Sequence, residues 1–165
     1  MSNSFTVETY SPKQVRLVIG GYQLVGWDSI SISRSVKGFT TIKGIRGKNT
    51  RVRNTDTSAT LTIPLIQTSP SNDVLSYIHE LDLDEGTGRL SLTLKDSSGR
   101  SIFSSNEGYI VSYPQASFSG ELTYRSWDIF CQTTGSYTIG GNTRPETNLL
   151  DSAINSASNY ITNLV

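Results

Sequence analysis

Short segments in which apolar and polar residues alternate recur along this 165-residue chain, and they constrain its fold more than any other feature. A period of two places the apolar side chains on one face of a β-strand. The pattern is present in residues 14–27, 27–36, 57–67 and 89–95, and strands are also expected in 107–113 and 121–131. Composition agrees, because Ile, Val and Thr total 42 residues against 4 Ala, and β-branched residues favour strands whereas Ala favours helices.

Local signals mark a turn and two helices. Gly20 and Gly21 follow an alternating run, and paired glycines accept the positive φ angles of a tight hairpin turn. Ser69 and Pro70 have the residue types of a helix N-cap and first helical position, and apolar residues follow at helical spacing: Val74, Leu75, Ile78 and Leu81. A C-terminal helix is predicted over 147–165, with one apolar stripe that suits either its own domain or a neighbouring subunit: Leu150, Ala153, Ile154, Ala157, Ile161 and Leu164.

Charge is distributed unevenly, although 14 basic and 14 acidic residues cancel. Residues 34–53 contain no acid, three glycines and seven basic residues, namely Arg34, Lys37, Lys43, Arg46, Lys48, Arg51 and Arg53. We expect a long, mobile basic loop outside the core. Residues 73–85 contain no Lys or Arg and five acids, namely Asp73, Glu80, Asp82, Asp84 and Glu85. The two stretches are either solvated faces or complementary patches, and patches on opposite faces would favour head-to-tail assembly.

Residues for catalysis or metal binding are scarce. The single cysteine, Cys131, excludes an internal disulfide, and the single histidine, His79, excludes a multi-histidine metal site. We predict a buried structural thiol and a surface or partly buried imidazole. No apolar run is long enough for a membrane-spanning helix, and the N-terminus lacks the pattern of a secretion signal. We therefore predict no enzymatic activity, no cofactor, no metal and no membrane association.

Two stretches of the sequence carry a recognisable pattern. The first is LTIPLIQTSPSNDVLSYI (residues 61–78), with its Thr-Ser-Pro-x-Asn-x-x-Leu segment, and the second is the aromatic-rich strand ELTYRSWDIFC (residues 121–131). Both resemble the tail tube proteins of contractile-tailed bacteriophages, and the resemblance extends over residues 13–131. It implies a β-sandwich or split barrel with a short flanking helix. Together with the loop and helix predicted above, we expect one mainly β domain over 1–165, with its β core at 13–145, the basic loop at 34–53 and the C-terminal helix at 147–165.

The resemblance also implies a function. Such subunits form hexameric rings that stack into a tube, and the β-lined channel conducts DNA during ejection. The expected partners are further copies of the chain, the tail sheath, tape measure and baseplate proteins, and DNA that passes without sequence-specific binding. The expected location is the virion tail, after synthesis in the host cytoplasm. In that setting the basic loop of one ring would contact an acidic face of the next, formed by Glu80, Asp82, Asp84 and Glu85.

Two other functions remain open from the residues alone. A soluble β-sandwich module of a baseplate or adhesin could use the basic loop to bind an acidic partner. Nucleic-acid binding by the loop is the weaker alternative, because the loop contains one aromatic residue, Phe39, and stacking surfaces for bases usually combine several.

Overall fold

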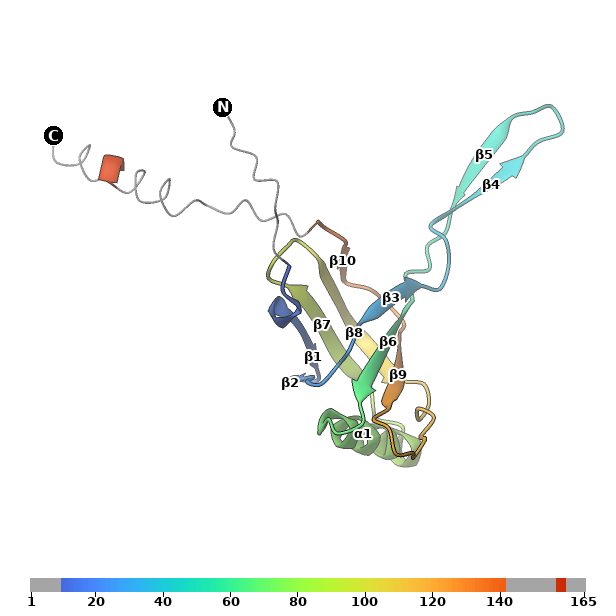
Figure 1. The fold of residues 1–165 in the computed structure, drawn as a ribbon. Helices are drawn as coiled ribbons and strands as arrows, with labels where there is room; N and C mark the ends of the chain where they lie inside the picture. The colour runs from blue at the N-terminus through green and yellow to red at the C-terminus, as the bar shows by residue number, and fades with distance from the viewer. Residues whose placement is uncertain (1–9, 142–156, 160–165) are drawn as a thin grey trace.

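The computed structural model describes residues 10–141 and 157–159 (Figure 1). In chain order the elements are η1 (Pro12–Gln14), β1 (Val15–Ile19), β2 (Tyr22–Gln23), β3 (Ser31–Arg34), β4 (Phe39–Lys43), β5 (Asn49–Arg53), β6 (Ala59–Ile66), α1 (Ser71–Glu85), β7 (Leu90–Asp96), β8 (Ile102–Ile110), β9 (Tyr124–Cys131) and β10 (Ser136–Thr138). The mainly β class predicted from the alternation is confirmed.

One antiparallel sheet runs in the order β2-β1-β7-β8-β9-β6-β3, with β10 paired to β8. The sheet bends where β8 passes from β7 to β9, because β8 pairs with β9 only through residues 108–110. Two layers result, β1 with β7 in one and β3, β6 and β9 in the other (Figure 1). The path ends at β2 and β3, so within the described residues the sheet is an open sandwich rather than a closed barrel.

The space between the layers holds the hydrophobic core. Strand β6 shows the predicted alternation in full, with Leu61, Ile63 and Leu65 buried and the residues between them less buried. Residues from both layers complete the core: Leu17, Ile19, Leu24, Ala59, Leu75, Leu92, Phe103, Ile110, Trp127, Ile129 and Cys131. The strand expected within residues 121–131 is present as β9, which lies between β8 and β6 in the sheet.

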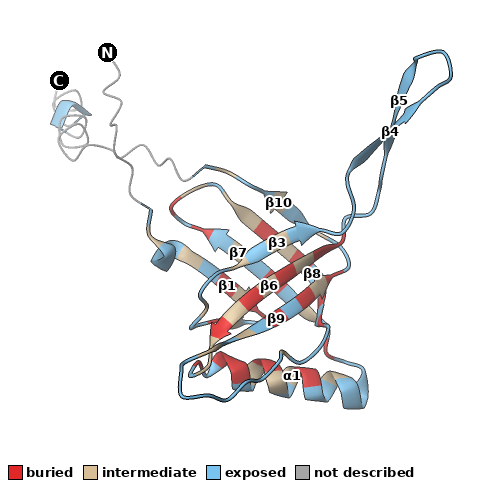
Figure 2. Cartoon of the chain, turned by 45° about the vertical axis from the view of Figure 1, so that its right-hand side comes forward, coloured by how far each residue is buried: buried red, intermediate tan, exposed pale blue. Residues whose placement is uncertain are grey.

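Helix α1 lies across one end of the sandwich (Figure 2). Its first residue is Ser71, one position later than predicted, with Pro70 rather than Ser69 at the N-cap, and Ser69 Oγ accepts a hydrogen bond from the Ser71 amide at 3.2 Å. The Asn72 side chain accepts a bond from Trp127 Nε1 (3.0 Å) and donates one to the Ile66 carbonyl (2.9 Å). The Thr-Ser-Pro-x-Asn segment that carries the resemblance therefore joins the helix to β6 and β9.

At two places in the body of the protein, the residue type is explained by the backbone and not by side-chain packing. The hairpin predicted at Gly20 and Gly21 is present, with φ of 56° and 86°. Pro64 lies in β6, which is an interior strand, but the pairing of β6 with β3 stops at Thr62. The Pro64 carbonyl accepts the Asp28 amide on that side. Proline is tolerated there because its missing amide faces the side that β3 has left.

Residues 34–53 lie outside the core as predicted, but most of them form a β-hairpin rather than an irregular loop. Strands β4 and β5 pair from Phe39↔Arg53 to Lys43↔Asn49, and Gly47 takes a φ of 80° in the turn. We call residues 39–53 the arm, and all its residues are exposed. The β-branched residues Thr40, Thr41, Ile42, Thr50 and Val52 explain the strands, and the intervening glycines and cations hid this signal.

The predicted C-terminal helix over 147–165 lies outside the described residues, except for 157–159, which are helical. In the described part of the chain, no helix combines the length and apolar character required to span a bilayer.

Candidate assembly interface

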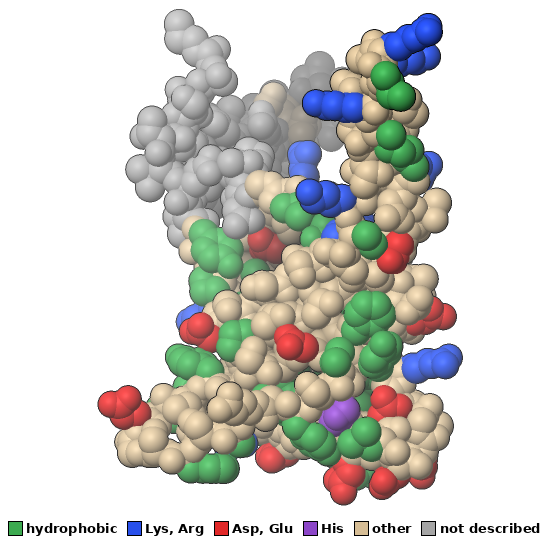
Figure 3. All heavy atoms as spheres, turned by 90° about the vertical axis from the view of Figure 1, so that its right-hand side faces the viewer, with side chains coloured by type: hydrophobic (Ala, Val, Ile, Leu, Met, Phe, Trp, Pro, Cys, Tyr) green, Lys and Arg blue, Asp and Glu red, His purple; other side chains and the backbone are tan. Residues whose placement is uncertain are grey.

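The basic and acidic residues singled out from the sequence lie at opposite ends of the molecule. The arm extends from one end of the β3–β6 layer, and α1 lies across the other end (Figure 2). Figure 3 shows Lys and Arg side chains gathered on and around the arm and Asp and Glu side chains gathered over the α1 end. A subunit with opposite charges at its two ends can bind another copy head to tail.

The seven basic residues divide into two groups. Arg34 precedes the arm, donates a hydrogen bond to the Thr57 carbonyl at 2.9 Å and lies 4.9 Å from the Tyr137 ring centroid, so it fixes the arm to the body. Arg51 lies over the Phe39 ring at 4.3 Å and stiffens the hairpin. The others are exposed and make no hydrogen bond or ion pair within the described residues, namely Lys37, Lys43, Arg46, Lys48 and Arg53.

The acidic residues divide in the same way. Asp82 accepts a hydrogen bond from the Gly88 amide at 2.8 Å and closes the turn after α1, where Gly86 takes a φ of 68°. Glu80, Asp84 and Glu85 are exposed and make no ion pair within the part of the chain that the structure describes. Three carboxylates at the end of α1 are therefore free to meet cations from another molecule.

Both ends also expose apolar side chains that the sequence analysis did not single out. On the arm, Ile42 is 60% exposed and Ile45 is fully exposed. At the α1 end, several large side chains are half or more exposed, namely Tyr77, Leu83, Phe118 and Leu122. Protein interfaces combine an apolar centre with a polar rim. A signal was available at Ile42 and Ile45, since they are apolar residues in a segment that cannot bury them internally.

Arg34 attaches the arm to the body where the arm begins. Where the arm ends, a tight, hydrogen-bonded turn attaches it to the body. The Asp56 amide donates to Asn54 Oδ1 (3.0 Å), and Asp56 Oδ1 accepts the Ser58 amide (2.8 Å). Hydrogen bonds from Ser58 lower the pKa of the Asp56 carboxyl below its usual 3.8, with a further contribution from the charge of Arg34. Both ends of the arm are thus held by specific polar contacts.

The two candidate reactive residues are placed as parts of the structure. Cys131 is buried as predicted, and burial raises the pKa of its thiol despite a hydrogen bond with Ser105. His79 is only 5% exposed, more buried than we expected, and its ring packs edge-on against Tyr113 with centroids 4.6 Å apart. Helix α1 places this imidazole where the helix meets the segment that follows β8, so the ring is covered by that segment.

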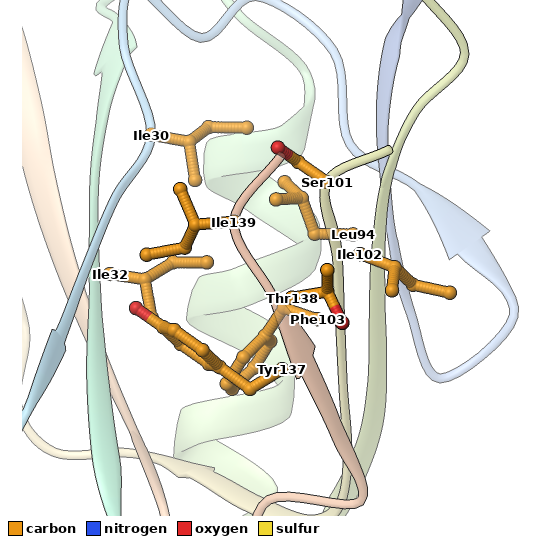
Figure 4. A pocket seen from close by; sticks show the side chains of 9 residues that line it. All are labelled: Ile30, Ile32, Leu94, Ser101, Ile102, Phe103, Tyr137, Thr138 and Ile139. Atoms are coloured by element: carbon orange, nitrogen blue, oxygen red, sulfur yellow. The ribbon is translucent and has the colours of Figure 1, made fainter. Parts of the chain in front are cut away.

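A small opening of about 210 Å³ lies between β3 and β10, where the two layers part. Figure 4 shows its lining, which is apolar apart from hydroxyl groups and comprises Ile30, Ile32, Leu94, Ser101, Ile102, Phe103, Tyr137, Thr138 and Ile139. The lining offers no carboxylate, imidazole or amine for catalysis.

The structure is an open β-sandwich with a projecting, charged arm, and both features are typical of subunits that bind other copies of themselves. No family model matches the sequence. The chain is 39% identical over 145 residues to the structural protein ORF10 of Pseudomonas phage KPP10, with 81% of this chain and 83% of that protein covered. The chain belongs to this family of phage structural proteins, in agreement with the predicted non-enzymatic role and virion location.

Solved structures show how widely the fold is shared. A chain from the virion of a native gene transfer agent particle matches with a TM-score of 0.55 at 14% identity, over 79% of this chain and 100% of that one. A chain from the tube-terminating cap of the anti-feeding prophage matches at 0.55 and 11%, over 82% and 97%. A chain from the sheath/tube terminator of an extracellular contractile injection system, PVC, matches at 0.53 and 11%, over 79% and 97%. The predicted architecture thus agrees with that of chains from a contractile injection system and from phage-like particles.

Proposed function

We propose that the chain is a subunit of a phage tail tube, that it forms hexameric rings, and that the rings stack around a β-lined lumen that conducts DNA during ejection. The observation that carries the proposal is the placement of the basic arm and the acidic end of α1 at opposite ends of the subunit (Figure 3). A contact between two different surfaces leaves one of each free after every addition, so it propagates along an axis.

Lateral assembly into a ring has its own support in the sheet. Strand β3 ends the sheet path, and the first half of β9 pairs with β6 but not with β8. Unpaired strand edges invite pairing with another chain, and closure into a ring satisfies them. Each subunit of a ring could therefore contribute the β3–β6–β9 layer to a continuous wall.

Charge sets the register of stacking more than its strength. An exposed ion pair contributes about 0–1 kcal/mol, and salt at physiological concentration screens charges beyond roughly 8 Å. The apolar residues Ile42 and Ile45 on the arm add contact area that salt does not weaken. Stacking should therefore slow at high salt without being abolished.

Electron microscopy of the purified full-length protein tests the proposal. We expect rings or tubes of uniform width as protein concentration rises, with longer tubes at low salt. A monomer at every concentration and salt would contradict the proposal and favour the soluble binding module of a baseplate or adhesin.

The sheath, tape measure and baseplate proteins are the further partners that a tail tube implies.

A second candidate is a ring that terminates the tube, and the fold shared with chains from the PVC terminator and the anti-feeding prophage cap favours it. A terminator occurs once per tail, whereas a tube subunit repeats along the whole length. The number of copies per virion, measured by quantitative mass spectrometry against a known tail component, separates them. Copies equal to a single ring support the terminator, and many rings support the tube.

A further inference from the structure

The two outer faces of the sandwich carry different chemistry. On strands β3, β6 and β9 the residues that point away from the core in the middle of the layer and towards the arm are mostly hydroxylic, and we call them the hydroxyl face: Ser31, Ser33, Thr60, Thr62, Ser126 and Asp128. The strand register brings them side by side, as in Ser33↔Thr60 and Thr62↔Asp128. In Figure 2 this layer lies in front of β1 and β7.

No cation points outward from these three strands. Their two arginines occupy inward positions, because Arg34 pairs with the buried Ala59 and Arg125 pairs with the buried Leu65. Arg34 then turns to the Tyr137 ring, and Arg125 lies 5.4 Å from the Phe118 ring centroid. Aromatic contacts thus hold both guanidinium groups off the hydroxyl face.

The face holds one carboxylate, that of Asp128. Its Oδ1 accepts a hydrogen bond from Thr62 Oγ1 at 2.7 Å, and no cation pairs with it within the described residues. The face is therefore hydrated and weakly negative. Apolar and aromatic residues occupy the outward positions at the α1 end of this layer, namely Pro64, Ile66 and Tyr124, and at its margin with β8, where Tyr109 and Phe130 pack 5.5 Å apart.

The opposite outer face is basic. On strands β1 and β7, Arg16 and Lys95 lie directly opposite each other in the register, and both are exposed. Two like charges directly opposite each other destabilise a sheet, and neither side chain has a carboxylate partner within the described residues. We call the outward residues of these two strands, Arg16, Val18, Ser91, Thr93 and Lys95, the cationic face.

We propose that the hydroxyl face of β3, β6 and β9 lines the lumen and that the cationic face of β1 and β7 lies on the outside of the tube. The inference rests on the proposed tube function and goes beyond it, because it assigns the surface that DNA meets. Lys and Arg bind phosphates without regard to sequence, so a basic wall would retain moving DNA, whereas hydroxyl groups and carboxylates would let it pass. The same layer continues directly into the arm (Figure 1), so one wall would run from ring to ring.

Cysteine labelling of assembled tubes tests this assignment, because the only native thiol, Cys131, is fully buried. We would place one cysteine on the hydroxyl face (Ser126→Cys) and one on the cationic face (Thr93→Cys), both at exposed positions. Each variant is treated with a small maleimide and with a maleimide conjugated to a globular protein too bulky for the lumen. Ser33→Cys is the second hydroxyl-face variant, in case Ser126→Cys assembles poorly.

In tubes, we expect the small reagent to label both positions and the bulky reagent to label Thr93→Cys at least tenfold faster than Ser126→Cys. In dissociated subunits the bulky reagent should label both equally, which is the control. Fast bulky labelling of Ser126→Cys in tubes, or its protection from both reagents, would overturn the assignment. If the unmodified protein forms no tube, the proposed function itself fails, and this result is separate from the labelling outcome.

Discussion

The body and the arm use β-strands in opposite ways. In β6 every second residue is buried against the other layer, whereas in β4 and β5 every residue is exposed. The body's sequence is therefore explained by its own packing. The arm's sequence is not, since the exposed Ile42 and Ile45 bury nothing and its cations other than Arg51 make no hydrogen bond, ion pair or ring contact within the described residues. This difference is the reason why we propose that the arm contacts another molecule.

The arm is nevertheless stiffened by contacts within it and at its two attachments to the body. A two-stranded hairpin alone is marginally stable in water. Here the contact of Arg51 with Phe39 supports its strands, and Arg34 and Asp56 fix its two attachments. A stiffened arm loses less conformational entropy when it binds another molecule, which would favour the proposed stacking contact.

Removing the Trp127 side chain should have the largest effect on the body. Trp127→Ala deletes a buried ring of the core and the hydrogen bond to Asn72, and we expect a loss of about 3–5 kcal/mol in the free energy of unfolding. Urea denaturation measures it. Trp127→Phe is the control that keeps most of the packing and should lose clearly less. A loss below about 1 kcal/mol for the alanine variant would contradict the claim that the body's sequence is explained by its own packing.

Asn72 should have the next largest effect, because it joins α1 to the sandwich. Asn72→Ala leaves Trp127 Nε1 without its partner and removes one of the two hydrogen bonds to the Ile66 carbonyl, which keeps the Ser69 amide, and an unsatisfied buried polar group costs about 1–3 kcal/mol. Thermal unfolding of the variant tests this value, with Asn49→Ala as a surface control, because the exposed Asn49 side chain makes no hydrogen bond within the described residues. Equal stability of the two variants would show that the motif does not fix the helix.

Asp56, at the attachment of the arm, should have a smaller and pH-dependent effect. The pKa of its carboxyl is lowered in the folded protein, so its stabilising contribution is fully present above the usual pKa of 3.8 and is lost as pH falls through the folded value. The stability difference between the native protein and Asp56→Asn should therefore shrink on acidification. Urea denaturation between neutral pH and pH about 3 measures it. A difference that stays constant would contradict this account.

Neutralising the arm should have the smallest effect on stability and a large one on assembly. A variant with Arg46, Lys48, Arg51 and Arg53 replaced by Ser changes only exposed side chains, and we expect unfolding free energies within about 0.5 kcal/mol of the native value. Electron microscopy should show blocked ring stacking. Normal tube growth by this variant would remove the charge argument for the arm.

The sequence predicted the body better than the arm for a physical reason. Burial imposes a period of two, so the strand around Leu61 and Ile63 could be recognised, and Ser69 with Pro70 marked the start of α1. The arm buries nothing, so no such period was imposed and its strands were taken for a loop. Arg34 donates to the carbonyl of Thr57, which is distant in sequence, and Asp82 accepts from the amide of Gly88, in a turn that the fold creates. The sequence pattern therefore did not indicate these two structural roles.

The candidate interface was predicted in composition but not in placement. Residue charges are visible in a sequence, whereas their position at opposite ends depends on how β3 and β6 direct the arm and how Asn72 seats α1 on the sandwich. The distinct chemistry of the two outer faces likewise follows from register, which places Arg16 opposite Lys95.

The most direct test of head-to-tail stacking is a mixing experiment with two charge-reversed variants. One carries Arg46→Glu, Lys48→Glu and Arg53→Glu on the arm, and the other carries Glu80→Lys, Asp84→Lys and Glu85→Lys on α1, with Asp82 kept for the turn that it closes. Each variant alone would place like charges at every stacking contact, whereas in a mixture each arm meets an oppositely charged helix. Electron microscopy should show no tubes from either variant alone and tubes from the mixture. Tubes from each variant alone, or none from the mixture while the native protein assembles, would contradict the account.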